Sequence, residues 1–153
     1  MRVYFASALF TQVEKRWNRL LAESLIRAMP GLIVVLPQDF KVAGKYNDPR
    51  HYGALFRMCV EALDASDAVL ATLDGAEVDS GVAWEVGYAY ARGKPVVGLR
   101  TDYRPGAEFG VNIMLSRSCR FLVREFSFRE EADELAKSVV RRLRKLRQGP
   151  GAK

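Results

Sequence analysis

The chain contains few of the residues that bind metals or form disulfides. Its 153 residues include two cysteines, Cys59 and Cys119, and one histidine, His51. The cysteines form no C-x-x-C pair and lack the ligand spacing of common zinc sites, so we predict neither a metal nor another cofactor. Isolated thiols are typical of reduced, largely buried side chains. We expect Cys59 to be a core residue and His51 to be structural, in a polar loop or at a helix start.

Long apolar segments are also missing. No apolar run approaches the roughly 18 residues that a membrane-spanning helix needs. The short apolar run at the N-terminus ends before Gln12 and Glu14, which is not the pattern of a signal peptide. We therefore expect a cytoplasmic protein without a membrane partner.

A phosphate-binding loop is also not indicated. Lys94 lies in Gly93-Lys94-Pro95 without the surrounding pattern of a phosphate-binding P-loop, and this segment fits the end of a helix instead.

Positive charge is concentrated at one end of the chain. The formal net charge is +6, but residues 137–153 contain seven basic residues and no acidic residue. The remaining residues hold 17 basic and 18 acidic side chains, which counts against a nucleic-acid partner, because such proteins need a basic folded surface. The basic residues of 141–147 fit the solvated face of an amphipathic helix. We expect residues 148–153 to be a disordered basic tail.

Five short apolar runs alternate with helical patterns, which predicts an α/β fold. Continuous apolar character is typical of parallel strands that are covered on both faces. We predict a three-layer, flavodoxin/Rossmann-like domain over residues 1–147, with a five-stranded parallel sheet in the order 2-1-3-4-5. The expected strands are Val3–Ala6, Leu32–Leu36, Ala68–Leu73, Val96–Leu99 and Arg120–Val123.

Helix boundaries follow from capping signals. Thr11 and Glu14 have the spacing of a capping box, and Pro30-Gly31 ends the helix that follows. Further helices are predicted from about Tyr52 to Leu63, and from Asp79 or Ser80 to Gly93. The last helix begins at a second capping box, Ser127 with Glu130, and its charges complement the helix dipole.

In such sheets, ligands bind at the carboxyl ends of the strands, where the strand order reverses between the first and third strands. This rule selects three segments: Ala6–Phe10, Gln38-Asp39 and Asp74–Glu85. The third segment leads into a helix in which Glu85 is the only charged residue in eleven, from Gly81 to Ala91. A carboxylate without a partner on its own helix usually has a partner elsewhere or a task. The alternatives from pattern alone are that Glu85 faces water and that Asp79 is merely a helix cap.

Three separated blocks of sequence resemble the nucleoside 2-deoxyribosyltransferase family. They are Val3–Thr11, Asp79–Pro95 and the short Asn112-Ile113-Met114, and the resemblance spans roughly residues 2 to 125. The middle block, with Gly81-Val82-Ala83-Trp84-Glu85 at its centre, is the most specific of the three. The resemblance implies an enzyme that moves 2-deoxyribose between nucleobases.

The resemblance also implies roles for individual residues. Glu85 would attack the anomeric carbon and form a covalent deoxyribosyl-enzyme, and Tyr4 would orient its carboxylate by a hydrogen bond. Asp79 would bind a sugar hydroxyl, with Gly81 beside it, and Phe10 would contact the base. Asn112 and Met114 would reach into the site of a neighbouring subunit, so a homodimer or higher homo-oligomer with shared active sites is expected.

One position departs from the family pattern. Several members carry an aspartate on the second helix that assists protonation of the base, and by register this position is Cys59 here. A thiol replaces a carboxylic acid poorly, so we take Asp39 as the candidate base contact and proton donor.

Related enzymes hydrolyse deoxynucleoside 5′-monophosphates and place serines around the phosphate. Asp79 would repel a phosphate but accept a hydrogen bond from a hydroxyl, which favours free nucleosides. Ser80, Ser116 and Ser118 keep the hydrolase alternative open. A non-catalytic nucleotide sensor on the same fold is a third reading, which would not need Glu85.

Overall fold

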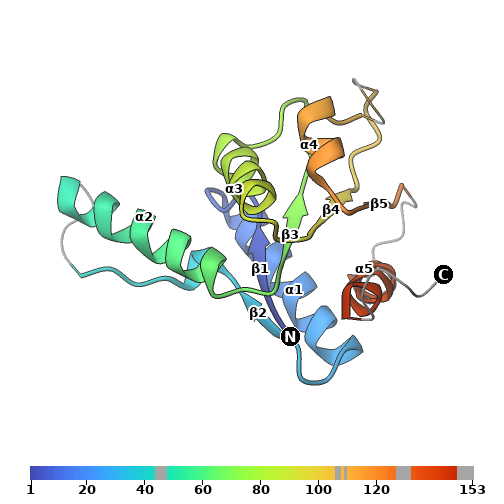
Figure 1. The fold of residues 1–153 in the computed structure, drawn as a ribbon, viewed down its shortest axis with the longest axis horizontal. Helices are drawn as coiled ribbons and strands as arrows, with labels where there is room; N and C mark the ends of the chain where they lie inside the picture. The colour runs from blue at the N-terminus through green and yellow to red at the C-terminus, as the bar shows by residue number, and fades with distance from the viewer. Residues whose placement is uncertain (44–47, 106–107, 109, 127–131, 148–153) are drawn as a thin grey trace.

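The computed structural model describes residues 1–43, 48–105, 108, 110–126 and 132–147. Five parallel strands form one sheet in the order β2-β1-β3-β4-β5 (Figure 1). This confirms the predicted α/β fold with flavodoxin-like strand order. The strands are β1 (Arg2–Ala6), β2 (Ile33–Val35), β3 (Ala68–Thr72), β4 (Val96–Arg100) and β5 (Phe121–Arg124).

Helices cover both faces of the sheet. Helices α1 (Gln12–Ala28) and α5 (Ala132–Arg147) pack against one face and contribute to one apolar cluster. On the other face, α3 (Ser80–Ala91) and the C-terminal end of α2 (Pro49–Asp64) contribute to a second cluster. The rest of α2 extends away from the body of the molecule (Figure 1).

The capping signals explain where the helices begin. Thr11 and Glu14 form the predicted capping box at the start of α1, with both reciprocal hydrogen bonds present. Helix α2 starts three residues before the predicted Tyr52, because Asp48 caps it and Pro49 occupies its first position. His51 therefore lies in the first turn of a helix. The second predicted capping box, Ser127 with Glu130, and the predicted tail 148–153 lie outside the described residues.

Two short elements were not predicted. Pro37–Asp39 forms a single 3₁₀ turn, and Ile113–Ser118 forms the six-residue helix α4, which Asn112 caps through its side chain. Both are too short to produce a recognisable hydrophobic period. No helix in the described part of the chain has the length and apolar character needed to cross a membrane.

Candidate active site

Tyr4 and Glu85 meet in the space between the sheet and α3. Tyr4 lies in β1, and its hydroxyl donates a short hydrogen bond to Glu85 Oε1. Glu85 lies on α3 beside Val82, Val86 and Ala89, which are the residues of this helix that pack into the core. The carboxyl group is therefore held against a buried tyrosine, and the interpretation that Glu85 faces water is wrong.

Burial changes the ionisation of Glu85. Burial, with a smaller contribution from the nearby negative charge of Asp79, raises the pKa of Glu85 to about 7. The hydrogen bond from Tyr4 acts in the opposite direction, because it favours the carboxylate. Near neutral pH, Glu85 thus exists in both the protonated form and the nucleophilic carboxylate form, a poise that is common for catalytic carboxyl groups.

Tyr4 is suited to be a permanent hydrogen-bond donor. Its side chain is fully buried, and this burial, together with the charge of Glu85, raises the pKa of the Tyr4 hydroxyl far above its usual value. The hydroxyl therefore stays protonated near neutral pH, where it donates to Glu85 and orients its carboxyl group.

Cys59 also faces this pair, which the sequence did not lead us to expect. Its thiol interacts with the Tyr4 hydroxyl and feels the charge of Glu85, and desolvation raises the pKa of the thiol. The side chain is half-buried rather than fully buried. Cys59 therefore lies beside Tyr4 and Glu85 as a neutral thiol, so the expectation of an ordinary core residue is wrong.

Asp79 caps α3 and at the same time faces the site. One of its oxygens accepts a hydrogen bond of 3.1 Å from the backbone N–H of Val82. A Cβ atom at Gly81 would lie 3.1 Å from this oxygen, so the glycine leaves room for the carboxylate. Asp79 thus combines the helix-capping role with a position next to Glu85, as the Coulomb interaction between the two carboxyl groups shows.

A cavity of about 420 Å³ opens at the carboxyl ends of β1 and β3, next to Asp79. Its wall includes the aromatic side chains of Phe10, which is 75% exposed, and Trp17. Tyr4 and Glu85 are not among its lining residues, so the cavity adjoins the pair through Asp79. The described lining residues are Ser7, Ala8, Phe10, Glu14, Trp17, Asn18, Thr72, Asp74, Gly75, Glu77 and Asp79.

Asn112 and Met114 border a different cavity. It measures about 410 Å³ and lies between α4 and the loop after β3, with Glu77 and Gly75 shared between the two cavities. Asn112 accepts a hydrogen bond of 2.9 Å from the N–H of Met114, and the Met114 side chain is 74% exposed. Within one chain, these residues do not join Phe10 and Asp79 in one cavity.

Other predicted residues lie apart from the site. Asp39 is exposed and forms an ion pair with Arg19, and it does not line the cavity. Ser116 donates to Glu108 and Ser118 to the carbonyl of Met114, so both hydroxyls are engaged within the chain.

Sequence reasoning missed Trp17 and Asn18 in the cavity wall. Both lie in the second turn of α1, whose N-terminal end adjoins the carboxyl edge of the sheet. Asn18 is 2% exposed and donates to the carbonyl of Ala8 at 2.9 Å, which ties α1 to the loop after β1. Extending the switch-point rule by two turns into the first helix would have included both residues.

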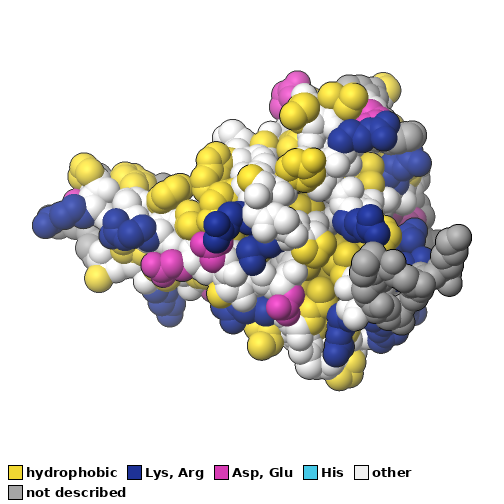
Figure 2. All heavy atoms as spheres, viewed as in Figure 1, with side chains coloured by type: hydrophobic (Ala, Val, Ile, Leu, Met, Phe, Trp, Pro, Cys, Tyr) yellow, Lys and Arg dark blue, Asp and Glu magenta, His cyan; other side chains and the backbone are white. Residues whose placement is uncertain are grey.

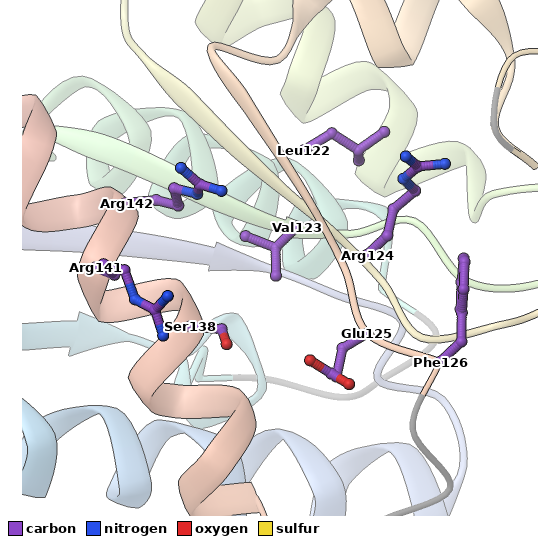
Figure 3. A pocket seen from close by; sticks show the side chains of 8 residues that line it. All are labelled: Leu122, Val123, Arg124, Glu125, Phe126, Ser138, Arg141 and Arg142. Carbon is purple, nitrogen blue, oxygen red and sulfur yellow. The ribbon is translucent and has the colours of Figure 1, made fainter. Parts of the chain in front are cut away.

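A third cavity, of about 470 Å³, lies between β5 and α5 (Figure 3). Its polar lining consists mainly of arginines with Glu125 and Ser138, and Figure 3 shows Arg124 and Arg142 on different sides of the β5 segment. It lies on another part of the sheet edge from Glu85, and neither Glu85 nor Asp79 lines it. Among the described residues, no cluster of three or more His, Cys, Asp or Glu side chains is arranged to hold a metal.

The geometry around Glu85 is suited to nucleophilic chemistry. A carboxylate that is buried, oriented by a fixed donor and close to an open cavity can attack an electrophilic carbon and form an ester. Retaining glycosyl transfer proceeds in this way, through an oxocarbenium-like transition state.

Comparison with known proteins agrees with this chemistry. The family model described as "Nucleoside 2-deoxyribosyltransferase" matches residues 3–115. A comparison with curated protein sequences gives no match. Among solved structures, a conserved protein from Enterococcus faecalis V583 is 27% identical with a TM-score of 0.72, over 93% of this chain and 98% of that chain.

Two further solved structures share the fold at lower identity. The 2-deoxyribosyltransferase from Bacillus psychrosaccharolyticus is 22% identical, with a TM-score of 0.69 over 89% of this chain and 90% of that one. The CMP N-glycosidase from Clostridium botulinum is 20% identical, with a TM-score of 0.57 over 92% and 98%. Since the family model covers most of the sequence, the chain belongs to the nucleoside 2-deoxyribosyltransferase family.

Proposed function

We propose that the protein is a nucleoside 2-deoxyribosyltransferase that works through a covalent glycosyl-Glu85 intermediate. The observation that carries this proposal is the buried Tyr4–Glu85 pair, in which the pKa of Glu85 is raised to about 7. Family membership supplies the reaction class, and the pair supplies an oriented nucleophile at the expected position.

In the first half-reaction, a Glu85 oxygen forms a bond to C1′ of the deoxyribose. The C1′–N bond to the base breaks, and the base leaves with the electron pair and takes up a proton. A 2′-deoxy sugar suits this step, because it lacks the electron-withdrawing hydroxyl that would destabilise the cationic transition state. In the second half-reaction, a nitrogen of a new base attacks C1′, loses its proton and releases the Glu85 carboxylate.

The cavity wall supports free nucleosides rather than nucleotides as substrates. Its described lining contains Glu14, Asp74, Glu77 and Asp79, and it contains no lysine or arginine. A phosphate dianion would be repelled there, whereas a sugar hydroxyl can donate a hydrogen bond to Asp79. Phe10 and Trp17 offer aromatic surfaces for a base.

A second copy of the chain is part of this proposal. Hydrophobic side chains are visible on the surface over α2, α3 and α4 (Figure 2). The exposed large ones on these helices include Phe56, Trp84, Ile113 and Met114. Phe56 and Trp84 contact each other edge to face with centroids 5.6 Å apart, so α2 and α3 present one apolar surface. A homo-oligomer that covers this surface would bring Met114 of one subunit to the site of another. Sedimentation of the purified protein tests this; a monomer at all concentrations would contradict it.

The test of the reaction uses two substrate sets. The protein is incubated with 2′-deoxyinosine plus adenine, and separately with deoxynucleoside 5′-monophosphates, and the products are separated by chromatography. We expect new 2′-deoxyadenosine, and we expect Glu85→Gln to lower its rate by at least about 10³-fold. Glu23→Gln, the same change at an exposed glutamate of α1, serves as the matched control.

Other outcomes point to other functions. Free base and deoxyribose 5-phosphate from the monophosphates would assign the protein to the hydrolases of this family. Ligand binding without turnover, unchanged in Glu85→Gln, would favour the non-catalytic sensor.

A further inference from the structure

Arg100 is the largest fully buried side chain of the described protein. It ends β4 and is 1% exposed. Removing a guanidinium group from water costs several kcal/mol, and an apolar side chain of similar size is often the more stable choice. We therefore expect the five N–H donors of Arg100 to hold neighbouring groups in place.

The guanidinium group binds the loop that follows β3. Its Nη1 donates to the carbonyl of Leu73 at 2.5 Å and to that of Gly75 at 2.9 Å. Its Nε donates to the carbonyl of Asp102 at 2.9 Å, and its Nη2 lies 3.8 Å from the Asp102 carboxylate. Arg100 thus joins the end of β4 to the first residues of the neighbouring loop.

Two aspartates fix the same loops from both sides. Asp74 accepts hydrogen bonds from the backbone N–H groups of Thr101, at 2.6 Å, and Asp102, at 3.0 Å. In return, Asp102 accepts one from the N–H of Gly75 at 3.0 Å. Hydrogen bonds from Arg104 hold the pKa of Asp102 well below its usual range, so its carboxylate stays charged.

Gly75 has the backbone conformation that this arrangement needs. Its φ is +107°, and a Cβ atom there would lie 2.6 Å from the carbonyl oxygen of Glu77. Four residues further along the chain, Asp79 begins α3. The position of Gly75 therefore sets the path of the loop that delivers Asp79 to the site.

Arg100 also lies beside the loop that carries Asn112. A Cβ atom added at Gly110, whose φ is +83°, would be at ordinary van der Waals distance from the guanidinium group, 3.5 Å from Nε and 3.6 Å from Nη2. Asn112 follows two residues later, caps α4 and lines the same cavity as Arg100 and Gly110. One buried side chain thus binds the first of the two loops that carry the proposed sugar-side residues and lies beside the second.

We propose that Arg100 is a positioning residue for substrate binding: it sets the loop of Asp79, and through Gly110 the loop of Asn112, against the sugar. This inference rests on the proposed function, in which Asp79 accepts a hydrogen bond from a sugar hydroxyl, and it takes this group to be the 5′-hydroxyl. Arg100 acts on the placement of the sugar and leaves the ionisation of Glu85 unchanged.

The test compares Arg100→Met and Arg100→Lys with the wild type on two substrates, a 2′-deoxynucleoside and its 2′,5′-dideoxy analogue, which lacks the 5′-hydroxyl. We expect Arg100→Met to lower kcat/KM for the complete nucleoside at least about tenfold, as for a misplaced binding group. The loss on the analogue should be at most about threefold, because the contact that Arg100 positions is missing there.

Two further measurements accompany this comparison. Arg100→Lys should keep more activity on the complete nucleoside than Arg100→Met does. The acid limb of the pH profile should stay at the wild-type pH.

The matched control is Arg120→Met, the same change at an exposed arginine that precedes β5 at the opposite end of the strands. Equal losses on both substrates in Arg100→Met, or a shifted acid limb, would overturn the inference, because a general structural defect affects both substrates alike. If Arg100→Met does not fold, Asp102→Ala takes its place, because it removes the acceptor of the Gly75 N–H. This variant must then show the same larger loss on the nucleoside that carries the 5′-hydroxyl. A wild type without turnover on either substrate would overturn the proposed function itself, whereas a wild type with turnover isolates the role of Arg100.

Discussion

The two faces of the sheet are covered in different ways. On one face, α1 and α5 enclose a cluster in which Leu21, Leu25, Val139 and Leu143 are almost completely buried. On the other, α3 and the end of α2 leave Phe56 and Trp84 exposed and enclose the paired Tyr4 and Glu85. Both faces bury apolar side chains, but only the second also holds the paired Tyr4 and Glu85 away from water. The burial of this carboxyl group is costly, and apolar burial elsewhere in the core offsets that cost.

The largest expected effect on stability lies on the α1–α5 face. Leu21→Ala should lower the free energy of unfolding by about 2–5 kcal/mol, because the cavity it creates cannot collapse fully. Leu20→Ala changes the preceding residue, which is 43% exposed, and should lower the free energy of unfolding by less than about 1 kcal/mol. Denaturant unfolding measures both. Equal losses for the two variants would contradict this expectation, because burial of Leu21 between α1 and the sheet would then contribute no more stability than the exposed Leu20.

A smaller change in the free energy of unfolding, this time an increase, is expected from a substitution on the α3 face. Burial raises the pKa of Glu85 from its ordinary value to about 7, so the folded protein holds this proton more tightly than the unfolded chain. The stability due to the protonated form is complete below the ordinary glutamate pKa and is lost as pH rises through about 7. Glu85→Gln should therefore stabilise the protein by at most about 3 kcal/mol at pH 8. At pH 5 the gain should be much smaller.

Thermal or denaturant unfolding of both proteins at the two pH values checks this. A variant that is less stable than the wild type at pH 8 would show that the α3 face gains stability from its carboxylate.

The smallest effect concerns the hydrogen bond within the pair. Tyr4→Phe removes a donor that lowers the pKa of Glu85, so that pKa should rise and the acid limb of kcat/KM should move to higher pH. The lost hydrogen bond to a charged group corresponds to about 1.5–3 kcal/mol, or a loss of at least roughly tenfold in rate at pH 6. Little loss is expected well above the new pKa. If the acid limb of the kcat/KM profile stays at the wild-type pH, Tyr4 only fills space beside Glu85.

Much of the fold could be predicted because the strands are apolar along their whole length. Val69 and Val97, for example, lie in central strands that helices cover on both sides, and continuous apolar runs mark such strands. The start of α2 was misplaced because a local cap, Asp48, determines it rather than the hydrophobic period. Helix α4 depends on the cap at Asn112, and its six residues are too few to show a period.

The site was only partly predictable. Glu85 stands out as a lone charge in an apolar helix, whereas its contact with Tyr4 depends on how β1 and α3 pack, and the family resemblance indicated it. Arg100 follows an apolar strand and gives no sign in the sequence that its side chain turns inward. Asp39 was chosen from its place in the chain, but the ion pair with Arg19 depends on the neighbouring helix α1.

The wall of the cavity next to Asp79 has a practical consequence for directed evolution. Trp17 and Asn18 belong to α1, and this helix also supplies Leu21 and Leu25 to the main apolar cluster. Under the proposed function, a library that randomises these wall positions would sample new base preferences at the risk of losing folded protein. Phe10 precedes the helix and is mostly exposed, so its identity can be varied with little risk. The selectivity of such an enzyme is therefore most safely engineered from the loop inward, beginning at Phe10.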